Sequence, residues 1–127
     1  MADGDECPFC GVEPIELVTQ SNAAIAFRDR YPVAEHHTLV IPRRHVASLF
    51  ELNDEELADV WALVADVRRS LATEFEIEAF NVGVNDGVAA GQTVLHAHVH
   101  VIPRTAGDSG DPRGGIRWVI PDKACYW

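Results

Sequence analysis

Three histidines alternate with small apolar residues in the stretch 96–102, which reads HAHVHVI. Strict alternation with β-branched residues predicts a β-strand, in which successive side chains point to opposite faces. His96, His98 and His100 would then share one face, in steps of about 7 Å at ~3.3 Å of rise per residue. Such a row suits two chemistries. Imidazoles bind metal ions, or one imidazole attacks an electrophile while its neighbours orient it or protonate the leaving group.

A loop of small residues, NDGVAAGQT at positions 85–93, precedes the histidine row. Glycines let a backbone approach a ligand closely, and exposed backbone N–H groups suit phosphate oxygens. Gln92 and Thr93 add side-chain donors at the entrance to the row. Beside the histidines, this loop suggests a phosphate held next to an imidazole nucleophile.

A second chemical signal is the C-x-x-C pair formed by Cys7 and Cys10. Such a pair indicates half of a zinc site or a redox motif. A redox motif is expected at a strand-to-helix turn of a βαβ unit, whereas this pair lies at the extreme N-terminus. Structural zinc needs about four nitrogen or sulfur ligands. His45 and His96 could complete a Cys₂His₂ set.

The remaining sequence supplies the elements that must position these groups. Patterns of apolar residues predict strands at 15–19, 23–28, 38–41, 79–84 and 94–102. Asn53, followed by three acidic residues, predicts a helix N-cap. Apolar residues at helical spacing then predict one amphipathic helix to about Thr73, whose buried stripe comprises Leu57, Val60, Trp61, Val64, Val67 and Leu71.

The fold class that follows is α+β: a mostly antiparallel sheet of about five strands with one main amphipathic helix on one face. Residues 1–127 are expected to form a single domain, in which 105–127 is a C-terminal tail. The net charge of −10 argues against generic nucleic-acid binding, which needs a basic surface. No apolar run approaches the ~18 residues of a membrane span, and no secretory signal is evident, so a cytoplasmic protein is expected.

The stretch 91–104, GQTVLHAHVHVIPR, resembles the signature of the histidine triad (HIT) superfamily of nucleotide hydrolases and transferases. The blocks HTLVIPRRH at 37–45 and AFRD at 26–29 resemble the family's other landmark and its ribose-binding strand end. The tail from 107 to 121 is similar to the prokaryotic branch of dinucleoside polyphosphate (diadenosine tetraphosphate) hydrolases. The resemblance implies a HIT-like fold, a nucleotide substrate, and a homodimer joined across a helix and a strand edge.

The resemblance also implies an activity: cleavage at the α-phosphate through a covalent nucleotidyl-histidine, with release of a nucleoside monophosphate. His98, in the middle of the row, is the expected nucleophile. His100 is expected to donate to a phosphate oxygen or to the leaving oxygen, and His37 to orient His96 or hold the row.

Substrate contacts are expected from a further set of residues. Asp29 would bond the ribose hydroxyls. The phosphates would be positioned by Asn85, Gly91, Gln92 and Thr93. Arg104, Arg113 and Arg117 are candidate donors to a polyphosphate, which magnesium is expected to accompany.

In the galactose-1-phosphate uridylyltransferases, a branch of the same superfamily, a Cys pair and two histidines hold zinc. By position these ligands correspond to Cys7, Cys10, His45 and His96. If His96 binds zinc, the metal clamps the strand and catalysis is left to His98 and His100.

Three alternatives stay open. The row itself could bind a catalytic metal, although the sequence shows no obvious carboxylate base paired with it. The protein could instead be a nucleoside phosphoramidase. It could also be a nucleotide-binding regulatory module with weak turnover, because such a module would keep the same residues.

Overall fold

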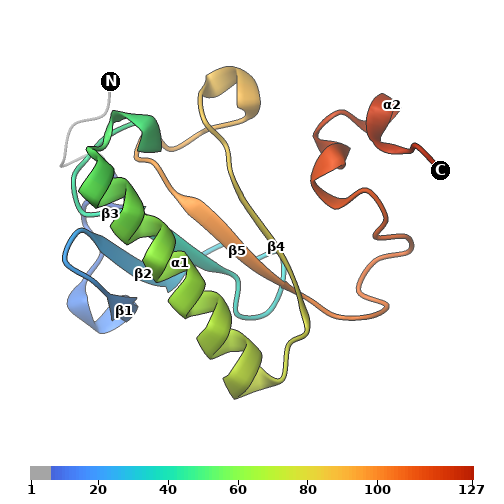
Figure 1. The fold of residues 1–127 in the computed structure, drawn as a ribbon, viewed down its shortest axis with the longest axis horizontal. Helices are drawn as coiled ribbons and strands as arrows, with labels where there is room; N and C mark the ends of the chain where they lie inside the picture. Colours follow the sequence, from blue (N-terminus) through green and yellow to red (C-terminus); the bar gives the residue numbers. More distant parts are fainter. Residues whose placement is uncertain (1–6) are drawn as a thin grey trace.

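An antiparallel sheet with the strand order β1-β2-β3-β5-β4 forms the frame of the protein (Figure 1). A computed structural model describes residues 7–127. The strands are β1 (Leu17–Gln20), β2 (Ala24–Arg28), β3 (Thr38–Pro42), β4 (Ala79–Val84) and β5 (Val99–Arg104). The long helix α1 (Asp54–Phe75) crosses one face of the sheet, and a short helix α2 (Pro121–Ala124) lies near the C-terminus. The predicted α+β class is confirmed.

Helix α1 begins as its sequence predicts. The side chain of Asn53 accepts a hydrogen bond from the backbone N–H of Glu56, whose carboxylate accepts one from the backbone N–H of Asn53. This capping box satisfies two backbone donors at the start of the helix. No helix in the described part of the chain is long and apolar enough to cross a membrane.

The main core lies between α1 and the sheet. The helix contributes the buried residues Val60, Leu63, Val64, Val67 and Leu71, and the sheet side contributes Ala24, Ala26, Val40, Ala97, Val99 and Val101. The prediction that Trp61 belongs to the buried stripe is wrong, since 42% of it is exposed. Leu63, which the predicted stripe omitted, is buried in its place.

Two predicted strands begin later in the chain than expected. The first is preceded by a 3-10 turn, Pro14–Glu16, with proline in its first position, so β1 begins only at Leu17. The last begins at Val99, because β3 ends at Pro42, which has no N–H to donate to the ladder. The backbone N–H of Ala97 instead donates to the carbonyl of Val46, at 2.7 Å.

The later start of β5 leaves His96 and His98 outside the strand, although the alternation of faces persists. Ala97, Val99 and Val101 point into the core under α1, as predicted. His100 pairs with Leu39 of β3 and therefore lies on the opposite face of the sheet.

The C-terminal segment, 105–127, lies beside the edge strand β4 (Figure 1). It contains the 3-10 turn Gly115–Val119 and helix α2. Ile116 approaches β4 so closely that a Cβ atom at Gly83 would lie 3.2 Å from its Cδ1 atom. A glycine at position 83 thus leaves room for the tail beside the face of the sheet that carries His100, which is called the histidine face below.

Candidate active site and metal centre

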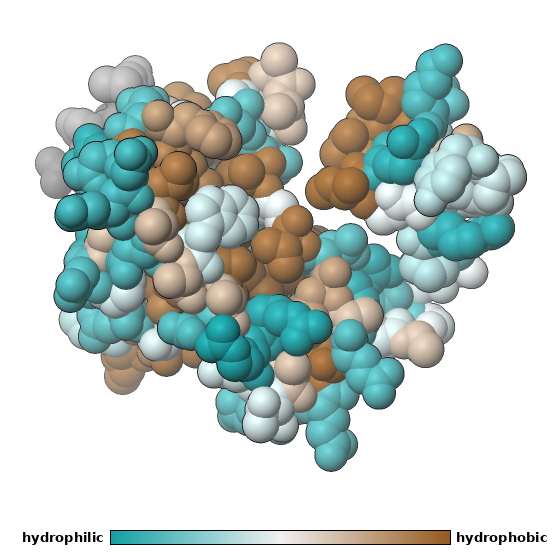
Figure 2. Space-filling view, viewed as in Figure 1, coloured by the Kyte–Doolittle hydropathy of each residue, from teal (hydrophilic) through white to brown (hydrophobic). Residues whose placement is uncertain are grey.

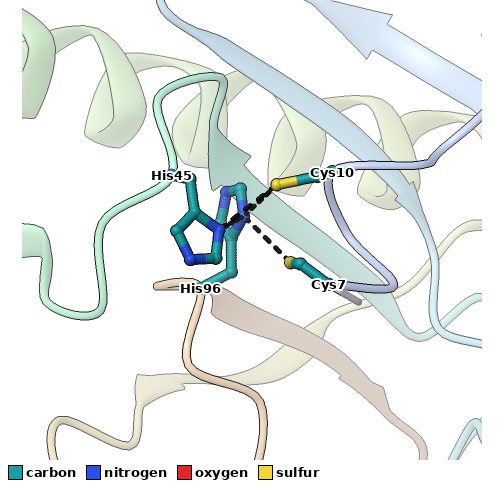
Figure 3. Close-up of side chains that lie close together, drawn as sticks. All are labelled: Cys7, Cys10, His45 and His96. Atoms are coloured by element: carbon teal, nitrogen blue, oxygen red, sulfur yellow. Dashed lines mark hydrogen bonds between the residues drawn. The ribbon is translucent and has the colours of Figure 1, made fainter. Parts of the chain in front are cut away.

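Four potential metal ligands converge at one end of the sheet (Figure 3). Cys7 and Cys10 come from the N-terminal turn, His45 from the loop after β3, and His96 from the segment before β5. The Nδ1 atoms of His45 and His96 lie 3.2 Å apart. The Sγ atom of Cys10 lies 3.2 Å from His45 Nδ1, and both sulfurs lie 3.5 Å from His96 Nδ1.

These distances suit a tetrahedral metal ion. With Zn–N bonds of about 2.0–2.1 Å and Zn–S bonds of about 2.3 Å, tetrahedral geometry separates two nitrogens by ~3.4 Å and a nitrogen from a sulfur by ~3.6 Å. The tautomer of His96 also fits. Its Nε2 lies 2.8 Å from the carbonyl oxygen of Pro42, which can only accept, so Nε2 carries the proton and the Nδ1 lone pair faces the thiols.

A redox role fits this cysteine pair less well. Burial, followed by the hydrogen bond and the charge of Cys7, raises the pKa of the Cys10 thiol to about 11. Reactive redox thiols have a lowered pKa, which a nearby positive charge or a helix N-terminus supplies. A set of two thiols and two imidazole nitrogens instead fits a structural zinc site.

His98 lies next to this cluster, and its side chain is hydrogen-bonded to the backbone of His96, a member of the cluster. Its side chain is only 7% exposed, and its Nδ1 lies 2.8 Å from the carbonyl oxygen of His96. The carbonyl must accept, so Nδ1 carries the proton of the neutral imidazole and Nε2 keeps a lone pair. Phe9 packs edge-on against the ring, with centroids 5.0 Å apart. His98 is therefore a buried imidazole whose neutral form has its lone pair on Nε2.

His37 contacts His100, which agrees with the second of its two expected roles, to hold the row, and not with the first, to orient His96. The Nε2 atom of His37 lies 2.9 Å from His100 Nδ1. Asp29 joins this pair, with Oδ2 3.4 Å from His37 Nε2 and 4.0 Å from His100 Nδ1. The row thus has a carboxylate neighbour, which the sequence did not reveal because Asp29 comes from the end of β2.

Both imidazoles of this pair resist protonation. Burial, together with the neighbouring His98 and His37, lowers the pKa of His100 to about 4. Burial also lowers the pKa of His37, although the charge of Asp29 opposes the effect. At neutral pH both rings are uncharged.

The same three residues are close enough to bind a metal ion, but the proton positions oppose it. The backbone N–H of Val33 donates to His37 Nδ1 at 3.1 Å, so the proton of His37 occupies Nε2, the atom that would have to bind the metal. Binding there would need the other tautomer, which places two donors face to face. This geometry disfavours a catalytic metal on the row.

The glycine-containing loop that was predicted to bind phosphate folds into the 3-10 turn Val88–Ala90, and the structure revises the role of Gln92. Gly87 and Gly91 both have φ of 99°, a conformation that favours glycine. The buried Gln92 amide donates to the carbonyls of Ala47 and Val94 and accepts from the N–H of Gly87. Gln92 therefore organises the loop and has no spare N–H for substrate. Thr93 and Gly91 are exposed, and Asn85 is half-buried.

The arginines of the tail already have hydrogen-bond partners in the tail itself and, for Arg104, in β4. Arg104 binds Asp108 and Asn81, and Arg113 binds Asp111. Arg117 donates to the carbonyls of Lys123 and Ala124, and its guanidinium lies over Tyr126. These contacts hold the tail together, so the arginines would reach a polyphosphate only by exchanging them.

The comparisons with known proteins agree with this geometry. A HIT domain matches residues 11–107. The chain belongs to the HIT family.

Relatives within the family carry two different enzyme names. The chain is 42% identical over 93 residues to the bis(5'-nucleosyl)-tetraphosphatase [asymmetrical] of Schizosaccharomyces pombe, covering 73% of this chain and 51% of that protein. It is 36% identical over 116 residues to the adenosine 5'-monophosphoramidase hnt1 of the same organism, covering 88% of this chain and 82% of that protein.

Solved structures share the fold, and one of them is of a Zn-bound family member. The Zn-bound histidine triad family protein from Mycobacterium smegmatis has a TM-score of 0.75 and 32% identity, covering 84% of this chain and 81% of that chain. The HIT-like fold is thereby shown.

Sequence reasoning missed the main-chain partners of the histidines. These are the carbonyls of Pro42 and His96 and the N–H of Val33. Backbone groups carry no residue-type signal. The proline that ends β3, Pro42, was the available hint, because it cannot continue the ladder and its carbonyl is left for a side chain.

Proposed function

We propose that the protein hydrolyses nucleotides at the α-phosphate, with His98 as the nucleophile. The observation that carries this proposal is the 2.8 Å hydrogen bond from His98 Nδ1 to the carbonyl of His96, which in the neutral ring leaves the lone pair on Nε2. A neutral imidazole with a fixed tautomer needs no separate base to activate it. The names of the relatives, a tetraphosphatase and a phosphoramidase, support a nucleotide substrate.

The reaction has two displacements at phosphorus. His98 Nε2 forms a bond to the α-phosphorus, and the bond to the leaving group breaks, with the electron pair going to the leaving oxygen or nitrogen. Water then attacks the nucleotidyl-histidine, the P–N bond breaks, and a nucleoside monophosphate leaves with loss of the water's proton. His100 donates a hydrogen bond from Nε2 to a phosphoryl oxygen or to the leaving atom. An amine leaving group also takes up one proton, which is balanced by the proton that the attacking water releases in the second step.

Substrate binding is assigned to the residues around these imidazoles. The Asp29 carboxylate accepts from the ribose hydroxyls. Asn85, Thr93 and the backbone at Gly91 position the phosphates, and Gln92 fixes the loop that presents them. The apolar cluster of Phe27, Leu39 and Ile41, with Phe9 packed against it, lies on the histidine face and offers a surface for the base.

We infer that zinc is bound by Cys7, Cys10, His45 and His96. Their donor set, spacing and the tautomer of His96 support this, together with the Zn-bound relative. When bound, zinc would act as a structural clamp between the N-terminal turn, the loop after β3 and the segment before β5. The chemistry is then left to His98 and His100.

We also propose a homodimer joined at the β4 edge. β4 is an outer strand of the sheet, and an unpaired edge with apolar side chains is a site for association. The adjoining tail exposes Ile116, Val119 and Ile120, and Figure 2 shows apolar surface on the tail across a hollow from the rest of the molecule. The test is molecular mass in solution by light scattering, with Val82→Lys as the disrupting variant.

The activity is tested by rapid-quench mass spectrometry with two substrates, diadenosine tetraphosphate and an adenosine phosphoramidate. The expected result is a nucleotidyl adduct on the peptide carrying residues 96–100. A higher kcat/KM on the phosphoramidate would assign the phosphoramidase activity. Binding of nucleotide without product or adduct would instead support the regulatory module.

A further inference from the structure

A single main-chain group determines which ring nitrogen carries the proton in His37 and in His100. The backbone N–H of Val33 lies 3.1 Å from His37 Nδ1 and can only donate. His37 Nδ1 therefore holds a lone pair, and the one proton of the neutral ring is on Nε2. That proton points to His100 Nδ1 at 2.9 Å, the shorter of its two acceptor distances.

The same logic then fixes His100. Because its Nδ1 accepts from His37, the proton of the neutral ring must be on Nε2, the nitrogen turned away from the pair. His98 is in the opposite state, with its proton on Nδ1 and its lone pair on Nε2. Two adjacent imidazoles of one row are thus prepared for opposite tasks, one to attack and one to donate.

The segment that presents the Val33 N–H is itself held by hydrogen bonds. The backbone N–H of Tyr31 donates to Asp29 Oδ1 at 2.8 Å, and that of His37 donates to the carbonyl of Ala34 at 3.1 Å. The Val33 side chain is 73% exposed, so the residue contributes to the site through its main chain.

We propose that the backbone N–H of Val33 and the imidazole of His37 act in series as positioning groups, which hold His100 in its Nε2–H form for donation to the substrate. The donor role of His100 rests on the proposed hydrolase function, whereas the proton positions belong to the free protein. Without His37, the nearest partner of His100 Nδ1 is Asp29 Oδ2, at 4.0 Å. A carboxylate accepts, so His100 would move its proton to Nδ1 and lose its donor.

Nitrogen-15 NMR of the imidazoles in the full chain tests the proton positions directly, because protonated and unprotonated ring nitrogens differ widely in chemical shift. The expected pattern at pH 7 is Nδ1–H for His98 and Nε2–H for both His37 and His100. Finding His100 with its proton on Nδ1 would overturn the proposal. This measurement needs no substrate, so absence of turnover would count against the hydrolase function alone.

Paired substitutions test the effect on catalysis. His37→Leu removes the donor to His100 Nδ1, and we expect His100 to become Nδ1–H. We then expect kcat to fall by about 100-fold, the lower range for loss of one hydrogen-bond donor to a transition state, with KM changed much less. His37→Gln keeps an amide that can accept from Val33 and donate to His100, so kcat should stay within about 10-fold of wild type. Equal losses in the two variants, with the His100 tautomer unchanged, would show that His37 only packs.

The main-chain step has its own variant. Val33→Pro removes the N–H that donates to His37 Nδ1, and Val33→Ala keeps it. In Val33→Pro we expect a detectable share of the His37 signal to shift to Nδ1–H, with Val33→Ala unchanged. If His37 has the same tautomer in both variants, the N–H of Val33 does not determine the proton position of His37. If Val33→Pro does not fold, the His37 pair still decides the role of His37.

Discussion

The two ends of the histidine row use the same side chain in opposite ways. At the Cys7/Cys10 end, the imidazoles of His45 and His96 turn their Nδ1 atoms toward one point shared with two thiols. At the Asp29 end, donors and acceptors alternate from Val33 through His37 to His100. Converging lone pairs need a cation between them, whereas an alternating chain is complete without one. For His96 and His37, the partner of the remote ring nitrogen makes this difference: it is the carbonyl of Pro42 for His96 and the N–H of Val33 for His37.

His98 lies between the two ends, and its replacement should have the largest effect. His98→Ala removes the proposed nucleophile, so kcat should fall by about 10⁴-fold or more, while nucleotide affinity stays close to that of wild type. Steady-state kinetics and calorimetric titration with a nucleoside monophosphate measure the two quantities. His36→Ala, which removes a histidine outside the row, is the control. Turnover by His98→Ala within about 10-fold of wild type would contradict the assignment.

Removing the metal should destabilise the fold and leave the Asp29 end unchanged. Cys7→Ser deletes a buried ligand, and loss of a structural metal is among the large single effects, so we expect a loss of about 3 kcal/mol, or a fall in Tm of about 10 °C. Zinc analysis should find about one ion per chain in the wild type. Cys125→Ser, which changes an exposed thiol outside the cluster, should behave as wild type. If the wild type contains no zinc and Cys7→Ser leaves its Tm unchanged, the proposal that the Cys7/Cys10 end binds a structural metal is wrong.

The sequence predicted which residues gather at this site better than it predicted how they interact. Alternation predicted the histidine row, and the resemblance to the HIT superfamily implied the grouping of ligands that the structure shows, which comprises Cys7, Cys10, His45 and His96. The pairing of His37 with His100 was missed, because cross-strand register cannot be read from either segment alone.

Two other errors have the same origin in tertiary contacts. The predicted strand at 94–102 ignored the missing N–H of Pro42 on the neighbouring strand. Gln92 was expected to bind phosphate because its amide is a good donor. Its donors are instead taken by the carbonyls of Ala47 and Val94, one of them distant in sequence.

The Asp29 end should make the fold sensitive to acid. In the unfolded chain a histidine binds a proton near pH 6.5, whereas burial lowers the pKa of folded His100 to about 4. Between these values the unfolded state binds more protons, so stability is full above pH 6.5 and is lost as the pH falls toward 4. The shift corresponds to about 2–3 kcal/mol.

Denaturant unfolding at pH 7 and pH 4.5 measures this loss. The His100→Gln variant should lose less stability over the interval than wild type, because it lacks the group that must be kept neutral. His36→Gln, which removes a histidine that stacks on Phe75, is the matched control. An equal pH dependence in His100→Gln and wild type would show that acid acts elsewhere, for example on the Cys/His cluster.

The smallest expected effect separates the two roles of Asp29. Its Oδ1 accepts from the N–H of Tyr31, and Oδ2 faces His37 and, in the proposed complex, the ribose. A 2′-deoxynucleotide leaves that carboxylate with one partner fewer, so it should bind more weakly by about 1–2 kcal/mol. Titration of wild type with the ribo- and deoxynucleotide measures this difference. In Asp29→Asn the discrimination should shrink, because a neutral amide is a weaker acceptor. If Asp29→Asn discriminates as well as wild type, the carboxylate serves the His37–His100 pair alone and the ribose is bound by another group.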